Sequence, residues 1–175
     1  MIDWNYIQQR HAACLTETTQ LIALPQWVVQ PQEVIPTRHK TKYGMADVHG
    51  RVHINQAFVG SSAEQLLEAT IRHELAHLCV GLEQGHNARF RHMAQLFKAG
   101  FHQVSRREKI ELHQLIGYKY ALYACLVNQQ RVCLKKVHRK HRKYTHYKPT
   151  LFRYLSFQGV KISHFEYSAL DQKNA

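Results

Sequence analysis

The stretch His73-Glu74-Leu75-Ala76-His77 constrains this chain of 175 residues more than any other, because its two histidines are one helical turn apart. On an α-helix, residues i and i+4 lie on the same face, so the two imidazoles can bind one cation. Glu74 follows the first histidine and can reach water in an open coordination position, as a general base must. The pattern therefore predicts a hydrolytic zinc site on a helix.

The sequence around the motif predicts the helix that such a site requires. Ser61-Ser62-Ala63-Glu64 matches a capping box, which predicts a helix start just upstream. Apolar residues then recur at spacings of three and four, as expected for a face buried against a core. Gly81 predicts the helix end, and Gly85 allows a turn back toward the helix. We expect a helix over about residues 62–80. The apolar face comprises Leu67, Ile71, Leu75 and Leu78.

Three residues compete for the place of the third ligand. His86 follows a glycine after the motif helix. Glu83 lies six residues after His77, the third-ligand offset of metzincin-type sites, but that pattern needs a glycine where Val80 stands. His92 lies deeper in the next predicted helix. We favour His86, because three histidines leave one position for water and make the site catalytic, whereas a structural zinc has four protein ligands.

The neighbourhood of the motif resembles the SprT-like metalloproteases, the group that includes Spartan. The resemblance rests on residues 69–77, Ala-Thr-Ile-Arg-His-Glu-Leu-Ala-His, and on residues 85–93, Gly-His-Asn-Ala-Arg-Phe-Arg-His-Met. In that family, a Gly-His followed by an aromatic residue and Met comes after the His-Glu-x-x-His helix. The resemblance covers about residues 3–165 and is specific around 69–107.

The resemblance implies a fold and a set of roles. The expected fold is α+β, a zincin-like metalloprotease core in which helices pack on a small antiparallel sheet. The ligands of one catalytic Zn²⁺ are then His73, His77 and His86, and the catalytic base is Glu74. A strand at the edge of the cleft pairs with the substrate chain in such folds. The resemblance gives this substrate-strand role to Val52, His53 and Ile54.

The predicted elements divide the chain into a first domain over residues 1–117 and a second over 118–175. In the first we expect a helix over 4–24, an extended connector over 26–36, a hairpin formed by 42–49 and 51–55, the motif helix, and helices over 87–99 and 105–116. In the second we expect strands over 120–125, 131–137 and 152–162.

The second domain is predicted to be a basic, aromatic, zinc-ribbon-like subdomain without its metal. SprT-like proteins of bacteria commonly carry a zinc ribbon here, with two Cys-x-x-Cys pairs. In this chain the first pair is reduced to Cys125, and Tyr154 and Phe157 stand in place of the second. One thiolate cannot hold a structural zinc, so we expect an aromatic cluster in place of the ion. An alternative is an unusual site made by Cys125, Cys133, His138 and His141.

Positive charge is concentrated in the second domain. Lys and Arg exceed Asp and Glu by 24 − 12 = 12, and residues 131–148 contain no acid. Such a density of cations predicts a polyanionic partner, most commonly nucleic acid, although a solvated basic tail is the alternative. The predicted contact residues are Arg131, Lys135, Lys136, Arg139, Lys140, Arg142 and Lys143. Five nearby aromatic residues could stack on unpaired bases or form the subdomain's core: Tyr144, Tyr147, Phe152, Tyr154 and Phe157.

The remaining features predict the setting of the protein. Cys14, Cys79, Cys125 and Cys133 form no Cys-x-x-Cys pair and are interpreted as reduced thiols, with Cys79 a buried structural one. The chain has no run of eighteen apolar residues and no secretory signal pattern. We therefore expect a cytoplasmic monomer that does not contact membranes and can associate with the nucleoid.

These patterns favour a zinc-dependent endopeptidase, a metallopeptidase and hydrolase, whose substrates are proteins bound or crosslinked to DNA, single-stranded DNA being one such form. The alternative is a nucleic-acid-binding protein whose zinc site is structural or vestigial. A deformylase-type hydrolase ranks last, because its cysteine ligand comes from a glycine-rich motif and Cys14 lacks those surroundings.

Overall fold

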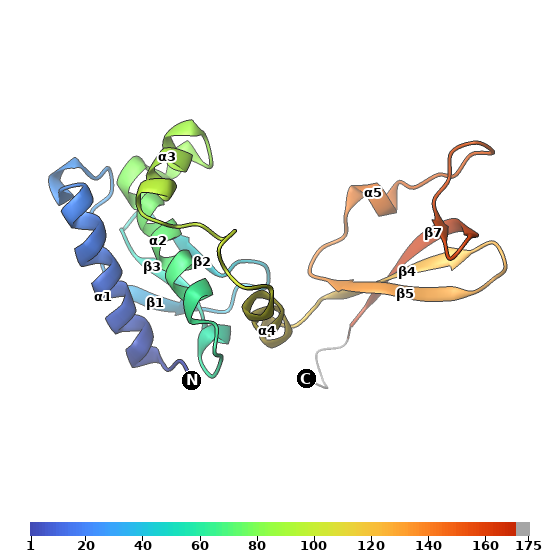
Figure 1. Ribbon diagram of the computed structural model, residues 1–175, viewed down its shortest axis with the longest axis horizontal. Helices are drawn as coiled ribbons and strands as arrows, with labels where there is room; N and C mark the ends of the chain where they lie inside the picture. The colour runs from blue at the N-terminus through green and yellow to red at the C-terminus, as the bar shows by residue number, and fades with distance from the viewer. Residues whose placement is uncertain (171–175) are drawn as a thin grey trace. The chain divides into compact units, whose positions relative to one another are not determined.

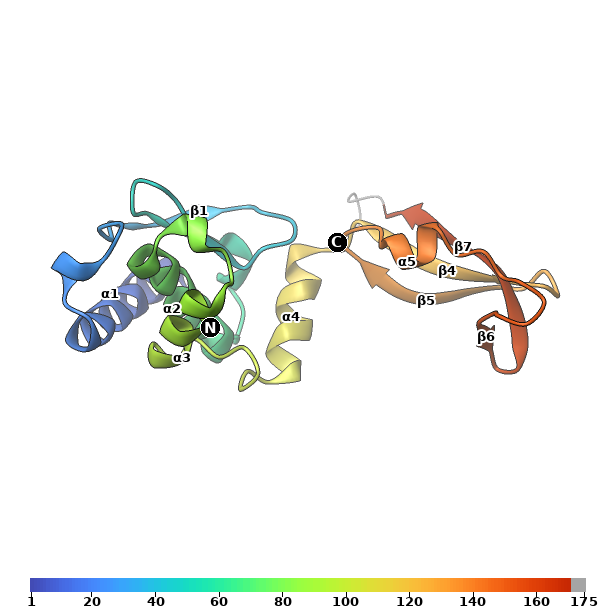
Figure 2. The same ribbon diagram turned by 90° about the horizontal axis from the view of Figure 1, so that it is seen from above.

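The chain folds into two units of the α+β class, the first ending at Ile116 and the second beginning at Gly117. The structure, a computed structural model, describes residues 1–170. The first unit contains α1 (Trp4–Leu21), β1 (Val34–Thr37), β2 (Gly44–Ala46), β3 (Val52–Asn55), α2 (Glu64–Val80), α3 (Ala88–Leu96) and α4 (Arg106–Ile116), with 3-10 turns at Leu24–Gln26, Gln56–Phe58 and Leu82–Gln84. Figures 1 and 2 show α2 lying between α1 and the sheet.

The motif helix α2 is held by burial. Twelve of its 17 residues are buried, and the expected apolar face is confirmed, because Leu67, Ile71, Leu75 and Leu78 are all 0% exposed. Packing of this kind stabilises a helix more than its intrinsic propensity does. Gly81 ends the helix with a φ of 98° and donates its N–H to the carbonyl oxygen of His77. The predicted stop is therefore confirmed.

The start of α2 differs from the expected capping box. Its N-cap is Ala63, which has no capping side chain. Two carboxylates of α4 supply the acceptors instead: Glu108 accepts from the N–H of Leu66 at 2.7 Å, and Glu111 accepts from the N–H of Ser62 at 2.7 Å. Acidic groups here satisfy unpaired amides and oppose the helix dipole. The cap comes from forty residues away in sequence, so the local pattern around Ser62 could not reveal it.

The sheet of the first unit is mixed, which corrects the expectation of an antiparallel sheet. Its strand order is β1-β3-β2, with β2 antiparallel and β1 parallel to β3. The predicted hairpin is thus confirmed as β2 and β3. The parallel strand was expected to be part of an extended connector because it contains Pro36. Proline has no N–H to donate, but an edge strand tolerates it.

Because β3 is the central strand, the substrate-strand role expected for Val52, His53 and Ile54 is wrong. Both sides of β3 are already hydrogen-bonded, to β1 and to β2, so no further chain can pair with it. Val52 and Ile54 are fully buried in the core. The His53 ring bonds Asp47 at 2.9 Å. The outer edge of β2 is the side of this hairpin that is left for another strand.

An ionic network ties α1 to α2. The Arg72 guanidinium is buried and pairs with Glu17 of α1 and Glu68 of its own helix, while Arg10 of α1 also pairs with Glu68. A buried guanidinium needs such partners, because its desolvation is otherwise unfavourable. The network fixes the helix that carries the motif against its neighbour.

The second unit contains β4 (Tyr120–Leu126), β5 (Arg131–Val137), α5 (Arg142–Thr145), β6 (Ser156–Phe157) and β7 (Val160–Ala169). Its antiparallel strands follow the order β5-β4-β7-β6, and Figure 2 shows them as a long twisted hairpin joined by β7. A small core of Ala124, Leu126 and Ile162 is covered by partly buried side chains, among them Tyr147, Phe157 and Phe165. Within residues 1–170 no helix has the length and apolar character needed to cross a bilayer. All four cysteines are unpaired thiols.

His11 of α1 makes folding sensitive to pH. It is 6% exposed, and its Nε2 atom has no hydrogen-bond partner within residues 1–170. Burial lowers the pKa of His11 below its ordinary value of 6.5. The unfolded chain therefore binds a proton at a pH where the folded chain does not. The free energy of unfolding is largest above pH 6.5 and falls as the pH decreases below that value.

We predict that His11→Leu flattens this dependence. Denaturant unfolding in a chelator at pH 7.5 and 5.5 should show a fall in the wild type, to which His11 contributes up to about 1.4 kcal/mol per pH unit. His73 and His77 contribute equally in both proteins and cancel in the comparison. Equal slopes for the variant and the wild type would contradict the assignment.

Candidate metal centre

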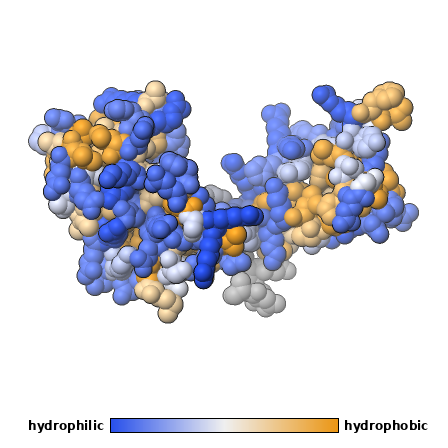
Figure 3. Space-filling view, viewed as in Figure 1, coloured by the Kyte–Doolittle hydropathy of each residue, from blue (hydrophilic) through white to orange (hydrophobic). Residues whose placement is uncertain are grey.

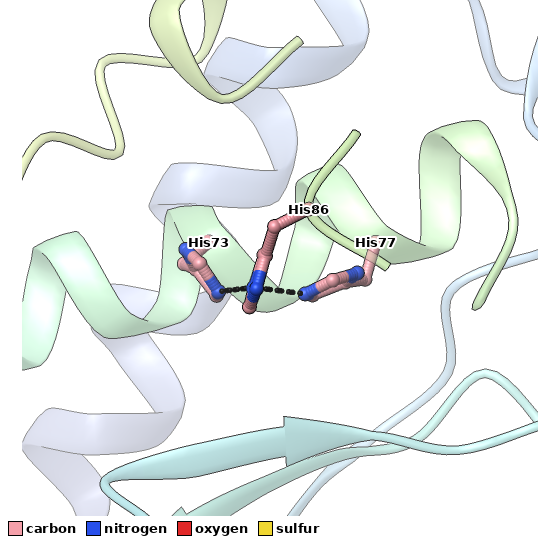
Figure 4. A group of neighbouring side chains, drawn as sticks. All are labelled: His73, His77 and His86. Carbon is pink, nitrogen blue, oxygen red and sulfur yellow. Dashed lines mark hydrogen bonds between the residues drawn. The ribbon is translucent and has the colours of Figure 1, made fainter. Parts of the chain in front are cut away.

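Three imidazole rings converge beside α2. His73 and His77 project from one face of the helix, and His86 turns toward both from the segment that follows it (Figure 4). The Nε2 atom of His86 lies 3.1 Å from that of His73 and 3.3 Å from that of His77. The three side chains form a cluster whose donor atoms all lie within 4.8 Å of one another. The structure thus brings together the three histidines that were predicted as ligands.

The spacing of these nitrogens fits one tetrahedral cation. A Zn–N bond of about 2.05 Å and a tetrahedral angle place two ligand nitrogens about 3.3 Å apart. The two measured separations of 3.1 and 3.3 Å are close to this value. A neutral imidazole has only one N–H, so hydrogen bonds alone give three facing rings few donors. The donor set therefore suits a borderline-soft divalent metal.

The ring protonation states suit the same purpose. The pKa of His73 is lowered to about 4, chiefly by burial and then by the charges of His77 and His86. Burial, followed by the charge of His86, also lowers the pKa of His77 to about 4. Both rings are consequently neutral near pH 7, and neutral imidazole is the form that coordinates a metal.

Phe90 of α3 orients the three rings. Its ring stacks on His77 with a centroid separation of 4.1 Å and meets the edges of His73 and His86 at 4.9 and 4.8 Å. Gly85, with a φ of 53°, makes the turn that returns His86 to the helix. Phe90 lies within the stretch that carried the family resemblance, but no spacing rule identified its contact with all three rings.

The competing ligands stay outside the cluster. Glu83 is exposed and accepts a hydrogen bond from the side chain of Gln84 at 3.0 Å. His92 is exposed on α3. Cys79 and Cys14 are both buried, and burial raises the pKa of each thiol to about 11. Neither thiol ionises readily, so the expectation of a buried structural Cys79 agrees with its surroundings.

Glu74 occupies a buried position next to the first histidine. It is 7% exposed, and burial raises its pKa to about 7, against the opposing effects of a hydrogen bond from the backbone of Ala46 and the charge of Lys42. A carboxyl group with this pKa can exchange a proton near neutrality, as general acid–base chemistry requires. Strand β2 therefore supplies the amide that orients the predicted base.

Gly44 allows β2 to approach the helix this closely. A Cβ atom at this position would lie 2.8 Å from Thr70 Cγ2, 3.0 Å from the His53 carbonyl oxygen and 3.3 Å from Glu74 Cγ. Sequence reasoning missed this position. The available signal was a glycine inside a short strand, which often marks a close backbone approach.

The second unit gathers a different group from the one that was considered. Among residues 117–170, Cys125 lies with His164 and Glu166, rather than with Cys133, His138 and His141. Arg131 pairs with Glu166 at 3.0 Å, so a guanidinium already neutralises the carboxylate.

The predicted basic residues are all exposed. They lie on β5, on α5 and on the segment between them: Arg131, Lys135, Lys136, Arg139, Lys140, Arg142 and Lys143. Arg131 is engaged with the ring of Tyr123, at 3.5 Å from its centroid, and with Glu166. Lys135 of β5 and Lys143 of α5 both lie over Tyr144, at 5.3 and 5.6 Å, so the two elements present their charges together.

The five aromatic residues separate into two groups. Tyr144 and Tyr147 pack edge-on against Phe165, each at 4.9 Å, and Phe157 also contacts the small core. Phe152 is 94% exposed and Tyr154 is 52% exposed. Figure 3 shows apolar spheres projecting at the end of this unit. Both readings of the aromatic residues therefore hold, each for different residues.

We predict that metal content separates the ligand candidates. After loading with Zn²⁺ and desalting, the wild type, Glu83→Ala and His92→Ala should each retain one ion in the first unit, whereas His86→Ala should lose most of its affinity. Metal analysis by mass spectrometry gives the stoichiometry. Loss of the ion in Glu83→Ala, with retention in His86→Ala, would reverse the assignment.

Comparisons with known proteins find little similarity. No family model matches the chain, and no curated protein matches it. Among solved structures, the metallopeptidase zymogen of Methanocaldococcus jannaschii jannalysin aligns with a TM-score of 0.41 and 18% sequence identity, over 66% of this chain and 95% of that chain. A likeness at this score establishes neither fold family nor activity. The resemblance to SprT-like proteases stays a prediction.

Proposed function

We propose that the first unit is a zinc-dependent endopeptidase. The observation that carries the proposal is the convergence of three neutral imidazole nitrogens at separations of 3.1 and 3.3 Å, with the carboxyl group of Glu74 adjacent in sequence. Three protein ligands leave one coordination position for water or substrate, as in catalytic zinc sites. A zinc ion held there would supply Lewis acidity toward a carbonyl oxygen and toward water.

Glu74 is the proposed general base. Its carboxylate takes a proton from the attacking water and later passes it to the leaving amine. The hydrogen bond from Ala46 keeps the carboxyl group in a fixed orientation during both transfers. The burial of Glu74 excludes bulk water that would otherwise solvate the carboxylate.

The outer edge of β2 is the proposed place for the substrate chain. Tyr43 and Asp47 form backbone hydrogen bonds with Asn55 and Arg51, toward β3. Because backbone groups alternate in direction along a strand, those of Gly44 and Ala46 point to the opposite side. An extended peptide can add there as a further strand, next to the amide that orients Glu74. This replaces the role first expected for β3.

Glu74→Gln tests the base directly. The variant should bind zinc as the wild type does but cleave a protein substrate about 10²- to 10⁴-fold more slowly, because only the proton-transfer group is lost. Glu83→Gln removes an exposed carboxylate nearby and should cleave at the wild-type rate. Undiminished cleavage by Glu74→Gln would exclude the proposed mechanism.

We further propose that the second unit binds DNA and that the substrates are proteins held on it. The cations of β5 and α5 offer contacts to phosphates, and the exposed rings of Phe152 and Tyr154 are suited to stack on unpaired bases. Binding through this unit would raise the local concentration of DNA-bound proteins without a selective cleft. If such binding occurs with no proteolysis, the protein is a nucleic-acid-binding protein with a vestigial metal site.

Charge reversal tests the DNA contact. We expect Lys135→Glu combined with Lys143→Glu to weaken binding to single-stranded DNA and to reduce the salt dependence by about 0.7 per lost phosphate contact. Phe152→Ala should weaken binding by about 1–3 kcal/mol if a base stacks there. The control is Arg106→Glu with Arg107→Glu, an equal charge change on exposed positions of α4, measured by the same fluorescence anisotropy titration. Equal weakening by both pairs would show that only net charge matters.

A further inference from the structure

A cavity of about 670 Å³ opens beside the proposed metal centre, with His73 in its lining. One wall is a face of α3, from Phe90 to Gln95, and the other is the segment 98–103 that follows the helix. The Phe101 ring lies 5.2 Å from the ring of His73. A substrate side chain in this cavity would therefore lie close to the bond being cleaved.

The floor of the cavity is apolar. Phe90 and Ala99 are buried at 3% and 5% exposure, and Ala94 and Phe101 are half-buried. Removal of apolar substrate surface from water favours binding in such a cavity. The small side chain of Ala94 leaves room where a larger residue on the same helix face would fill the space.

The rim of the cavity is basic. Arg91 and Lys98 line it and are exposed, and none of its lining residues is Asp or Glu. Arg91 donates a hydrogen bond to the carbonyl oxygen of His86 at 3.3 Å, which holds the guanidinium close to the metal centre. A negatively charged group of the substrate is favoured at such a rim and a positive one is disfavoured.

The backbone of Lys98 gives independent support. Lys98 has a φ of 57°, and the next amide, of Ala99, donates to the carbonyl oxygen of Ala94 at 2.8 Å. This is the helix-ending geometry in which glycine costs least, and other residues adopt it with strain. Strained positions of this kind cluster at functional sites. The strained residue here is the lysine that places its side chain on the rim.

We infer that this cavity is a specificity pocket for a large apolar side chain next to the cleaved bond, with an acidic residue beside it. The inference rests on the proposed peptidase function and names the substrate class of that site. Contacts with the floor select for size, and Lys98 with Arg91 selects the charge of the neighbouring residue. The cleft thus disfavours lysine and arginine near the cleaved bond.

Binding of labelled peptides to zinc-loaded Glu74→Gln tests the pocket separately from catalysis. The probes are one peptide with Leu-Glu at its centre and two matched peptides with Ala-Glu and Leu-Lys. The Leu-Glu peptide should bind at least about tenfold more tightly than Ala-Glu and about threefold more tightly than Leu-Lys. Equal binding of the three peptides, or no binding of any, would overturn the inference.

Two further substitutions, each added to that protein, locate the preference. Ala94→Trp should abolish the advantage of leucine over alanine by filling the cavity. Lys98→Glu should reverse the preference for glutamate over lysine, and it changes an exposed side chain, so it stays informative if Ala94→Trp fails to fold. Arg89→Glu is the matched control, because Arg89 is exposed on α3 but does not line the cavity. Unchanged preferences in Lys98→Glu would overturn the inference.

The two proposals fail in different ways. Selective peptide binding without cleavage by the wild type would refute the peptidase function and leave the pocket intact. Cleavage of all three peptides at equal rates by the wild type would refute the pocket and leave the peptidase function intact.

Discussion

The structure of the first unit depends on holding three imidazole nitrogens at the separation that a small divalent cation requires. Two of them belong to α2, whose buried face and ionic ties to α1 fix its position. The third, on His86, is returned to the helix by Gly81 and Gly85, which adopt φ values of 98° and 53°. Phe90 then packs against all three rings. Side chains locked by packing in this way can bind a metal with little reorganisation.

The same helix carries a second constraint, because Glu74 follows His73 on the side that faces β2. A glycine at position 44 lets the strand come within contact distance, and the amide of Ala46 bonds the carboxyl group. The sheet is therefore part of the site as well as of the core. Chemical groups are divided between the units: the histidines and the base lie in the first, and the densest positive charge lies in the second.

Local sequence patterns predicted the parts of the fold that local forces decide. The helix around the motif, its stop at Gly81, the turn at Gly85 and the hairpin around Gly50 follow from spacing and glycine chemistry. Tertiary contacts decide the rest. The cap of α2 comes from α4, and β1 joins the sheet despite Pro36, which makes β3 a central strand. The sorting of the aromatic residues, with Phe152 exposed and Tyr147 packed, depends on how β7 covers β4, which no periodicity encodes.

X-ray absorption at the zinc edge of the zinc-loaded protein tests the central claim most directly, because it reports the atoms bound to the ion. The geometry of the first unit predicts three imidazole nitrogens and one oxygen or nitrogen ligand at about 2.0–2.1 Å, with the multiple-scattering pattern of histidine and no sulfur at about 2.3 Å. A spectrum dominated by sulfur ligands, or one with fewer than three imidazoles, would contradict it.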